Sequence, residues 1–177
     1  VVYKPSGLLI QGDRTADVTL LDLAKHWIKR RYEKPGRVFL AIVHRLDRPV
    51  AGVVVFARTS KAAGRLSEQF RSGAVEKQYV AIVEGVVETP SARLVSHLER
   101  AGPTSRVIDT PTKTSREARL RFRVLGTLKD RTFLEIDLET GRHHQIRAQL
   151  AHMGHPIVGD LRYGAQKPMP QKQLALF

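Results

Sequence analysis

The stretch TGRHHQIR, residues 140–147, leads from a turn into a helix. Downstream of it, Ile146, Leu150 and Met153 recur at the spacing of one helical stripe, and Gly154 follows as a stop signal. We therefore expect a short helix that packs one face on a core and carries basic and polar side chains at its start.

The residues before this helix alternate with a period of two, which is typical of strands. Apolar and arginine side chains alternate over residues 118–124, and apolar and acidic ones over residues 133–138, with a turn at residues 126–130. We predict an antiparallel hairpin whose arginine face could contact phosphates.

Further elements are expected from the same kinds of pattern. Helices are predicted over residues 19–31 and 60–72, the second capped by Thr59 or Ser60 and by Gly73. Residues 53–56 read as a strand buried on both faces, and residues 78–83 as a second strand. Residues 89–116 are interpreted as a long irregular excursion with one short strand at 107–108, and residues 166–177 as a loosely ordered tail.

The composition predicts a globular protein that binds a polyanion. The 177 residues include 42% hydrophobic and 27% charged side chains, enough for one core and a single domain. Lys and Arg number 30 against 17 Asp and Glu, a formal charge of +13. Nucleic acid accounts best for this excess, and a merely basic surface is the alternative.

The chain contains no cysteine, which excludes disulfides and thiolate metal sites and favours the cytoplasm. Its longest apolar runs are too short to span a membrane, so we expect no membrane association. The chain opens inside what reads as a strand, and we expect its natural N-terminus to lie further upstream.

A carboxylate stands on a loop in the run HRLD, residues 44–47, just before the strand at 53–56. Taken alone, Asp47 between Arg45 and Arg48 is most often a surface ion pair or a loop cap. Only other segments of the chain can favour a catalytic role.

Four histidines raise the possibility of a metal site: His143, His144, His152 and His155. No cysteine is available, and no pair has the spacing of a helical zinc motif. RNA contact or turn packing suits them better, so we expect neither a metal nor a cofactor.

Several separated segments, in the right order, resemble the RluA-type RNA pseudouridine synthases. They are KPSGL at 4–8, HRLD at 44–47 with Gly52, KQYVA at 77–81 with Gly85, TGRHHQIR at 140–147, and GHPIVGD at 154–160 with Tyr163-Gly164. The resemblance covers nearly the whole chain. It implies an α+β fold with a long, mixed but mostly antiparallel sheet, flanking helices and an RNA-binding cleft, and a monomer acting on uridines of rRNA or tRNA.

The resemblance also implies roles for three residues that should converge in the cleft. Asp47 corresponds to the nucleophilic aspartate, and Arg147 to the arginine that pairs with it. Tyr79 corresponds to the tyrosine whose ring lies against the uracil. Without the resemblance, Arg147 would read as an exposed or phosphate-binding arginine and Tyr79 as a core or rim residue.

Arg45 corresponds to an arginine that enters the space left by an extracted nucleotide. Other predicted substrate contacts are His44, Arg142, His144, Gln145 and Lys4. The chain departs from the family pattern at Ala51, where serine is frequent, and at Gln149, where histidine is frequent. These departures bear on which substrate is used.

Two other classes of protein remain open from the sequence. A noncatalytic RNA-binding or ribosome-assembly module would share the charge and the fold. A nuclease or metal hydrolase built on the histidines would lose its activity to a chelator.

Overall fold

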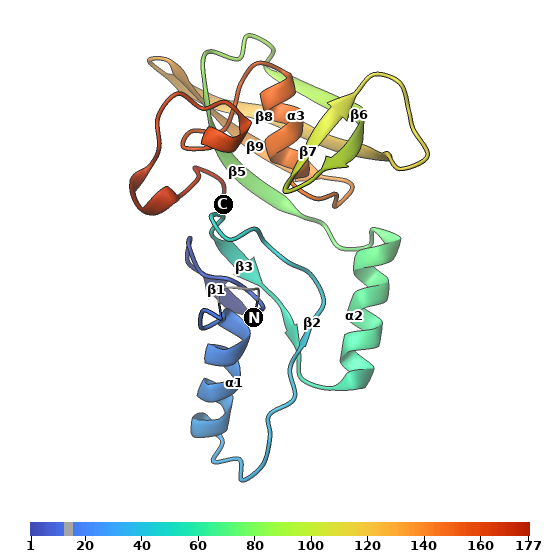
Figure 1. The fold of residues 1–177 in the computed structure, drawn as a ribbon, viewed down its shortest axis with the longest axis vertical. Coiled ribbons are helices and arrows are strands. Elements are labelled where there is room, and N and C mark those ends of the chain that lie inside the picture. Colours follow the sequence, from blue (N-terminus) through green and yellow to red (C-terminus); the bar gives the residue numbers. More distant parts are fainter. Residues whose placement is uncertain (13–15) are drawn as a thin grey trace. The chain divides into compact units, whose positions relative to one another are not determined.

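The computed structural model describes residues 1–12 and 16–177 (Figure 1). The chain separates into two compact units, residues 1–75 and residues 76–177. Each unit has a core cluster of its own. The single catalytic domain that we expected stays a prediction.

The first unit combines two small antiparallel sheets with two helices. Strand β1 (Val2–Lys4) pairs with β3 (Gly52–Val54), and β2 (Ala41–Ile42) pairs with β4 (Phe56–Ala57). The helices are α1 (Leu20–Arg31) and α2 (Ser60–Ser72). The buried core of this unit consists of Ile10, Leu20, Ile28, Leu40, Val54 and Phe56.

Both helices of this unit have the predicted ends. Thr19 caps α1, since its hydroxyl accepts a hydrogen bond from the Asp22 amide while the Asp22 carboxylate accepts one from the Thr19 amide. The Thr59 hydroxyl caps α2 by accepting from the Ala62 amide, and Gly73 ends that helix with φ of 78°. The caps predicted for α2 are therefore confirmed, and the bounds predicted for α1 from its apolar spacing agree with the structure.

The strand predicted over residues 53–56 is not buried on both faces. Val53 is 60% exposed, while its neighbour Val54 is fully buried. Because β3 belongs to a two-stranded sheet covered on one face only, alternate side chains point to solvent. The run of four apolar residues was a misleading signal.

The second unit is built on a five-stranded sheet of order β5-β9-β8-β6-β7. The strands are β5 (Gln78–Glu84), β6 (Ser91–Ala101), β7 (Thr104–Ile108), β8 (Arg116–Leu128) and β9 (Arg131–Leu138). All strand pairs described in the two units are antiparallel, so the mixed sheet that we expected is wrong, although the α+β class is correct.

Residues 89–116 are not an irregular excursion, because most of them form the hairpin of β6 and β7. The alternation of Ala92, Leu94 and Leu98 was present in the sequence, but Ser96 interrupts it on the same face. The serines and prolines of this segment suggested a loop. Tertiary packing nevertheless buries one face of the strand.

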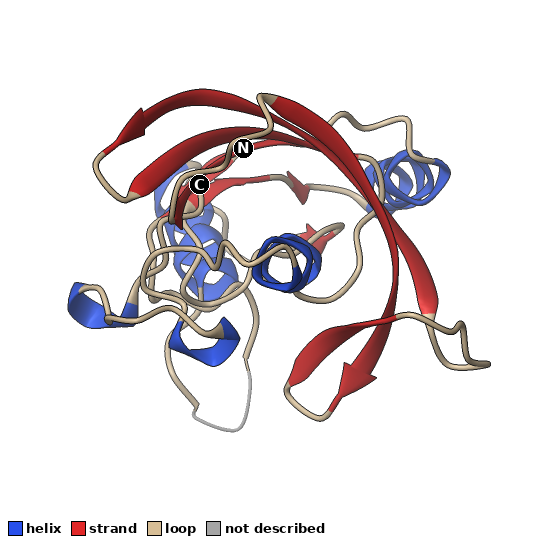
Figure 2. Cartoon of the chain, turned by 90° about the horizontal axis from the view of Figure 1, so that it is seen from above, coloured by secondary structure: helices blue, strands red, loops and turns tan. Residues whose placement is uncertain are grey.

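Helix α3 (Gln145–His152) lies against the curved sheet, which bends around it (Figure 2). Ala148 of α3 packs with Leu98 of β6 and Ala118 of β8 in the core cluster of this unit. Small side chains allow this close approach of helix and sheet. The predicted helix is confirmed within residues 141–153.

The end of the chain is ordered, contrary to the loose tail expected from residue 166. Phe177 and Val80 exchange two backbone hydrogen bonds of 2.9 Å, and Leu174 to Leu176 are buried. The tail passes so close to Gly159 that a Cβ there would lie 2.6 Å from the carbonyl oxygen of Gln173. These last residues therefore extend the sheet along β5.

No helix in the described part of the chain is long and apolar enough to cross a membrane.

Candidate active site

The loop that carries Asp47 is fastened to the turn that follows β1. The Arg48 carbonyl accepts hydrogen bonds from the Lys4 ammonium at 3.0 Å and from the Gly7 amide at 2.8 Å. The Ser6 hydroxyl donates to the Pro49 carbonyl at 2.7 Å. The KPSGL turn and the HRLD loop, far apart in sequence, thus form one rigid support for a partly exposed carboxylate.

Lys4 has a structural place in this support. Its side chain is fully buried and its ammonium also donates to the carbonyls of Leu8, at 2.8 Å, and Pro5, at 3.2 Å. Burial lowers the pKa of Lys4 to about 8, against an opposing effect from the charge of Asp47. All three donors of the ammonium are used internally, so Lys4 holds the turn and the loop together. The substrate contact that we predicted for it stays a prediction.

His44 links the same loop to the following strand. Its Nε2 accepts a hydrogen bond of 2.9 Å from the Val55 amide, and its ring stacks on Phe70 of α2 with centroids 4.7 Å apart. Burial lowers the pKa of His44, which favours the neutral ring that this acceptor role requires. Its predicted contact with RNA stays a prediction. Arg45, by contrast, is exposed two residues before Asp47.

In the second unit, Gln145 organises the turn at the start of α3. Its side-chain carbonyl accepts hydrogen bonds from the Thr140 hydroxyl at 2.7 Å and the Arg142 amide at 3.0 Å. Its amide group donates to the Arg119 carbonyl at 3.0 Å. Gln145 is buried and holds the turn, and its predicted contact with substrate stays a prediction.

Arg147 forms a buried ion pair with Asp160. Nε donates to Oδ2 at 2.7 Å and Nη2 to Oδ1 at 2.9 Å, and the two side chains are 5% and 1% exposed. Two parallel bonds fix both the position and the plane of the guanidinium. Its Cζ lies 4.9 Å from the ring centre of Tyr163, so the aromatic face also restrains it.

Tyr163 connects this ion pair to β7 and to His144 in the turn before α3. Its hydroxyl accepts a hydrogen bond from the Ser105 amide at 2.9 Å and shares another of 2.9 Å with Nδ1 of His144. The rings of His143 and His144 stack at 3.8 Å, and His144 takes the left-handed conformation with φ of 52°. A left-handed residue other than glycine at the start of a helix is unusual.

Asp160 and Tyr163 received no role from the sequence, although both lie in segments that resemble the family. The signal for Asp160 was its position directly after Ile157, Val158 and Gly159, because a carboxylate among buried apolar residues needs a cationic partner. No comparable signal marked Tyr163.

Tyr79 lies near the start of β5 on the face that includes the fully buried Ala81 and Val83. Close to it in sequence, Lys77 has its pKa lowered by burial and by the charge of Arg142. The Lys77 ammonium lies against the turn, 4.0 Å from where a Cβ on Gly141 would stand.

Lys77 and Arg142 therefore place two positive charges near each other. Among the residues described, neither has a carboxylate within ion-pair distance. Lys77 was missed as a site residue, and its place at the start of the KQYVA motif was the only signal for it.

The arginine face of β8 has a different electrostatic character from the one predicted. Arg121 lies 2.9 Å from Glu139, and Arg123 lies 2.6 Å from Glu135. Glu139 also lies 3.4 Å from Arg119. Neighbouring glutamates thus neutralise much of this charge, which weakens the interpretation of the face as a phosphate-binding edge.

No group of three or more histidine or carboxylate side chains in residues 1–12 and 16–177 is arranged to hold a metal ion. His143 and His144 instead bond to Ser105 and Tyr163.

The predicted site residues fall into two groups. Asp47, Arg45 and His44 lie in the first unit, and Tyr79, Arg142, His144 and Arg147 in the second. The convergence of Asp47 with Tyr79 and Arg147 joins the two units and stays a prediction.

Comparison with known proteins gives a family for this arrangement. The model of the RNA pseudouridylate synthase family matches residues 1–152. The chain belongs to this family. Its sequence is 37% identical over 172 residues to the ribosomal large subunit pseudouridine synthase D of Xylella fastidiosa, covering 97% of the chain and 50% of that relative. It is 33% identical over 177 residues to an uncharacterized RNA pseudouridine synthase of Aquifex aeolicus, covering 98% and 56%.

The fold of the family is also found in solved structures. Human RNA pseudouridylate synthase domain containing 4 superposes with a TM-score of 0.78 at 24% identity, covering 93% of the chain and 65% of that structure. The chain spans about half the length of the curated relatives it matches.

Proposed function

We propose that this chain carries the catalytic part of an RNA pseudouridine synthase, which isomerises uridine to pseudouridine. The observation that carries the proposal is the support of Asp47 by the KPSGL turn, in a chain whose family membership extends across both units. A noncatalytic RNA-binding module would need the basic surface. It would not need Asp47 on a loop held by the KPSGL turn, next to the buried ammonium of Lys4.

In this reaction the bond between N1 of uracil and C1′ of ribose breaks and a bond from C5 to C1′ forms. C5 loses a proton and N1 gains one, so no oxidant or cofactor is consumed. We assign Asp47 the nucleophilic role during the interval in which base and sugar are separated. The support is geometric: three groups of the KPSGL turn bind the loop directly after Asp47.

Arg147 is proposed as the cation that keeps Asp47 charged as water is excluded. A guanidinium has five N–H donors in a planar fork, which suits it to carboxylates. The two bonds to Asp160 fix the plane of that fork in Arg147. Tyr79 is proposed to lie against the uracil and to accept the proton released from C5. Its place at the beginning of β5, on the buried face, suits a partly enclosed ring.

RNA binding is proposed to use cations that have no carboxylate partner among the described residues. Lys77 and Arg142 suit one phosphate group, since two neighbouring positive charges are mutually repulsive until an anion lies between them. Arg45 suits the extraction of a stacked base, a step that costs a few kcal/mol. His144 is proposed to contact the nucleotide beside Arg142.

The proposed target is the RNA of the large ribosomal subunit, because relatives that share a third or more of the sequence are named for that substrate. Transfer RNA is the other substrate class. We place the activity in the cytoplasm, in agreement with a chain without cysteine.

The test is a transcriptome-wide map of pseudouridine in cells with and without the gene, with a third strain expressing Asp47→Asn. We expect one or a few sites in large-subunit RNA to disappear in the deletion strain and to stay absent with Asp47→Asn. An Asp109→Asn strain provides the matched control, since Asp109 is an exposed aspartate on a loop. Identical maps in all strains would contradict the proposed activity.

A further inference from the structure

Helix α1 exposes its large aromatic side chain on the side away from the core. Leu20 and Ile28 of this helix are buried in the core of the first unit. Trp27, the sole tryptophan of the chain, is 59% exposed, and Leu23, one turn before it, is 49% exposed. The helix thus has a second apolar strip that its own unit does not cover.

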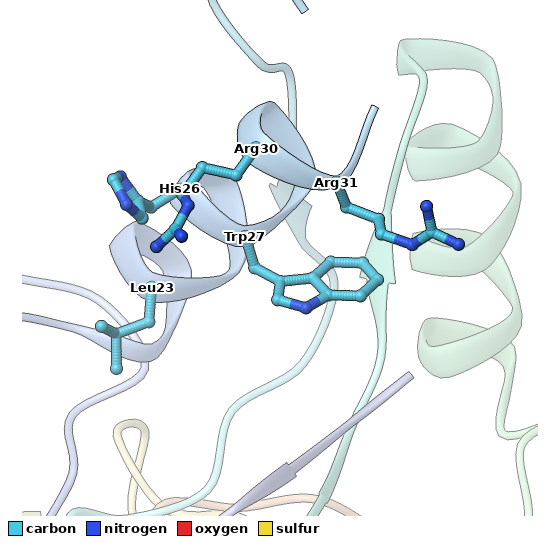
Figure 3. Close-up of a pocket in the computed structure, with 5 residues that line it drawn as sticks. All are labelled: Leu23, His26, Trp27, Arg30 and Arg31. Atoms are coloured by element: carbon cyan, nitrogen blue, oxygen red, sulfur yellow. The ribbon is translucent and has the colours of Figure 1, made fainter. Parts of the chain in front are cut away.

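This strip lies in a hollow of about 430 Å³ that two arginines and a histidine complete. In Figure 3 the indole of Trp27 extends away from the helix, with the Arg31 guanidinium beyond it and His26 and Arg30 on its other side. Such an aromatic face beside cations differs from a purely apolar docking surface, in which charges would be absent from the centre.

A second aromatic ring lies against Trp27. Tyr32 meets the edge of Trp27 with ring centres 6.2 Å apart, and it is 50% exposed. The guanidinium carbons of Arg58 and Arg31 lie 5.0 and 6.0 Å from its centre. We call the surface formed by His26, Trp27, Arg30, Arg31, Tyr32 and Arg58 the indole patch.

The charges of the indole patch are not neutralised within the described chain. Among the residues that the structure describes, no carboxylate lies within ion-pair distance of Arg30, Arg31 or Arg58, whereas Arg121 and Arg123 of β8 each have one. Basic residues in the last turn of a helix are favoured by its dipole, which accounts in part for Arg30 and Arg31. The dipole of α1 explains neither the exposed indole nor Arg58, which comes from a different segment.

We propose that the indole patch binds an unpaired segment of the substrate RNA. One base stacks on the face of Trp27, and Arg30 and Arg31 bind the adjoining phosphates. Stacking on an aromatic side chain next to cations is the general means by which proteins hold single-stranded nucleic acid without reading its sequence. The choice of an RNA partner rests on the proposed function, and the patch adds a contact outside the HRLD loop.

The single tryptophan provides a direct test in the complete protein. Titration with a short oligouridylate should quench the emission of Trp27 to saturation, and a blunt RNA duplex of equal length should quench it much less. Binding measured by fluorescence anisotropy of labelled RNA should weaken about 5- to 150-fold for Trp27→Ala. Trp27→Phe should bind nearly as the wild type does, because a ring is retained.

Two further variants serve as controls. One tests whether an apolar side chain without a ring is enough for binding, and the other tests whether loss of any exposed aromatic side chain weakens binding. Trp27→Leu keeps an apolar side chain without an aromatic face and should bind as weakly as Trp27→Ala. Phe39→Ala removes another aromatic residue of the same unit, 53% exposed, and should leave binding unchanged. Equal losses for Trp27→Ala and Phe39→Ala, or full binding by Trp27→Leu, would overturn the proposal.

The experiments distinguish failure of the indole-patch proposal from failure of the proposed enzymatic activity. If the protein forms pseudouridine but Trp27 shows no quenching, or already has the blue-shifted emission of a covered indole, the patch proposal fails and the activity stands. If Asp47→Asn is inactive yet quenches normally, both stand. If neither conversion nor binding occurs, both fail.

Discussion

Arg147 and Asp160 are joined inside the second unit by two hydrogen bonds, of 2.7 and 2.9 Å, between side chains that are almost fully buried. The pair explains how a charged residue near the start of α3 tolerates burial. The arginine proposed to bind Asp47 is therefore itself bound by a carboxylate of its own unit.

Asp160→Asn should destabilise the second unit strongly, since it removes the carboxylate charge that the buried guanidinium of Arg147 binds through two hydrogen bonds. Loss of one partner of a buried pair typically costs about 3 to 5 kcal/mol. Denaturant unfolding would measure this cost. Glu68→Gln, in the exposed pair with Arg71, is the control and should leave stability unchanged. A change for Asp160→Asn no greater than the control would contradict the structural role of the pair.

Tyr163→Phe should loosen β7 while leaving α3 in place. The substitution removes the oxygen that accepts a hydrogen bond from the Ser105 amide. A buried amide without a hydrogen-bond partner costs about 1 to 3 kcal/mol of stability, and Ser105 is buried. Hydrogen exchange resolved to single amides would report on it directly. We expect faster exchange at Ser105 and unchanged exchange at Ala148, whose amide bonds to the His144 carbonyl. Unaltered protection of Ser105 would show that the hydroxyl is dispensable.

His44 should make stability depend on pH. Burial lowers the pKa of His44 in the folded protein, so below the ordinary value of about 6.5 the unfolded chain binds more protons than the folded one. The contribution of His44 is therefore complete above about pH 6.5 and is lost progressively as the pH falls below that value. His44→Gln keeps an acceptor for the Val55 amide without titrating.

Unfolding free energies of the wild type and of His44→Gln, measured from neutral to mildly acidic pH, test this effect. We expect the wild type to lose more stability than the variant over the acidic half of that range. Parallel curves would mean that the environment of His44 is not the source of the pH dependence.

The helices and strands that the sequence predicted correctly are those whose bounds are determined by residues close in sequence. The bounds of α1 and α2 follow from Thr19, Thr59 and Gly73, whose capping chemistry is readable without tertiary information. The hairpin of β6 and β7 was missed because its inward face mixes Ala92 and Leu94 with serine, and only packing decides that such a face is buried.

Prediction of the site residues was limited in the same way, because local motifs are visible in the sequence and tertiary contacts are not. The motifs identified Asp47, Tyr79 and Arg147 as candidates, but contacts between distant segments determine what their neighbours do. Lys4 and Gln145 looked like substrate ligands because they are polar and lie in the family motifs. Both are buried, and their polar atoms bond to the protein's own backbone and side chains. Burial of a polar residue at the end of a strand or helix has no reliable signature in sequence.

Arg45→Ala should impair the enzyme mainly on structured RNA. Arg45 is exposed two residues before Asp47, where it can fill the space left by an extracted base. Extraction from a stack costs a few kcal/mol, whereas an unstructured oligonucleotide avoids most of that cost. Initial rates on a folded stem-loop and on an unstructured strand of the same sequence would be compared. Equal losses on both substrates would contradict the extraction role.

The nucleophilic role of Asp47 is tested most directly by single-turnover conversion with excess Asp47→Asn protein on its mapped RNA substrate. The near-isosteric change should abolish pseudouridine formation while RNA affinity stays within a few fold of the wild type. Asp109→Asn should convert the substrate at the wild-type rate. Pseudouridine formed by Asp47→Asn would contradict the assignment of this aspartate and the mechanism built on it.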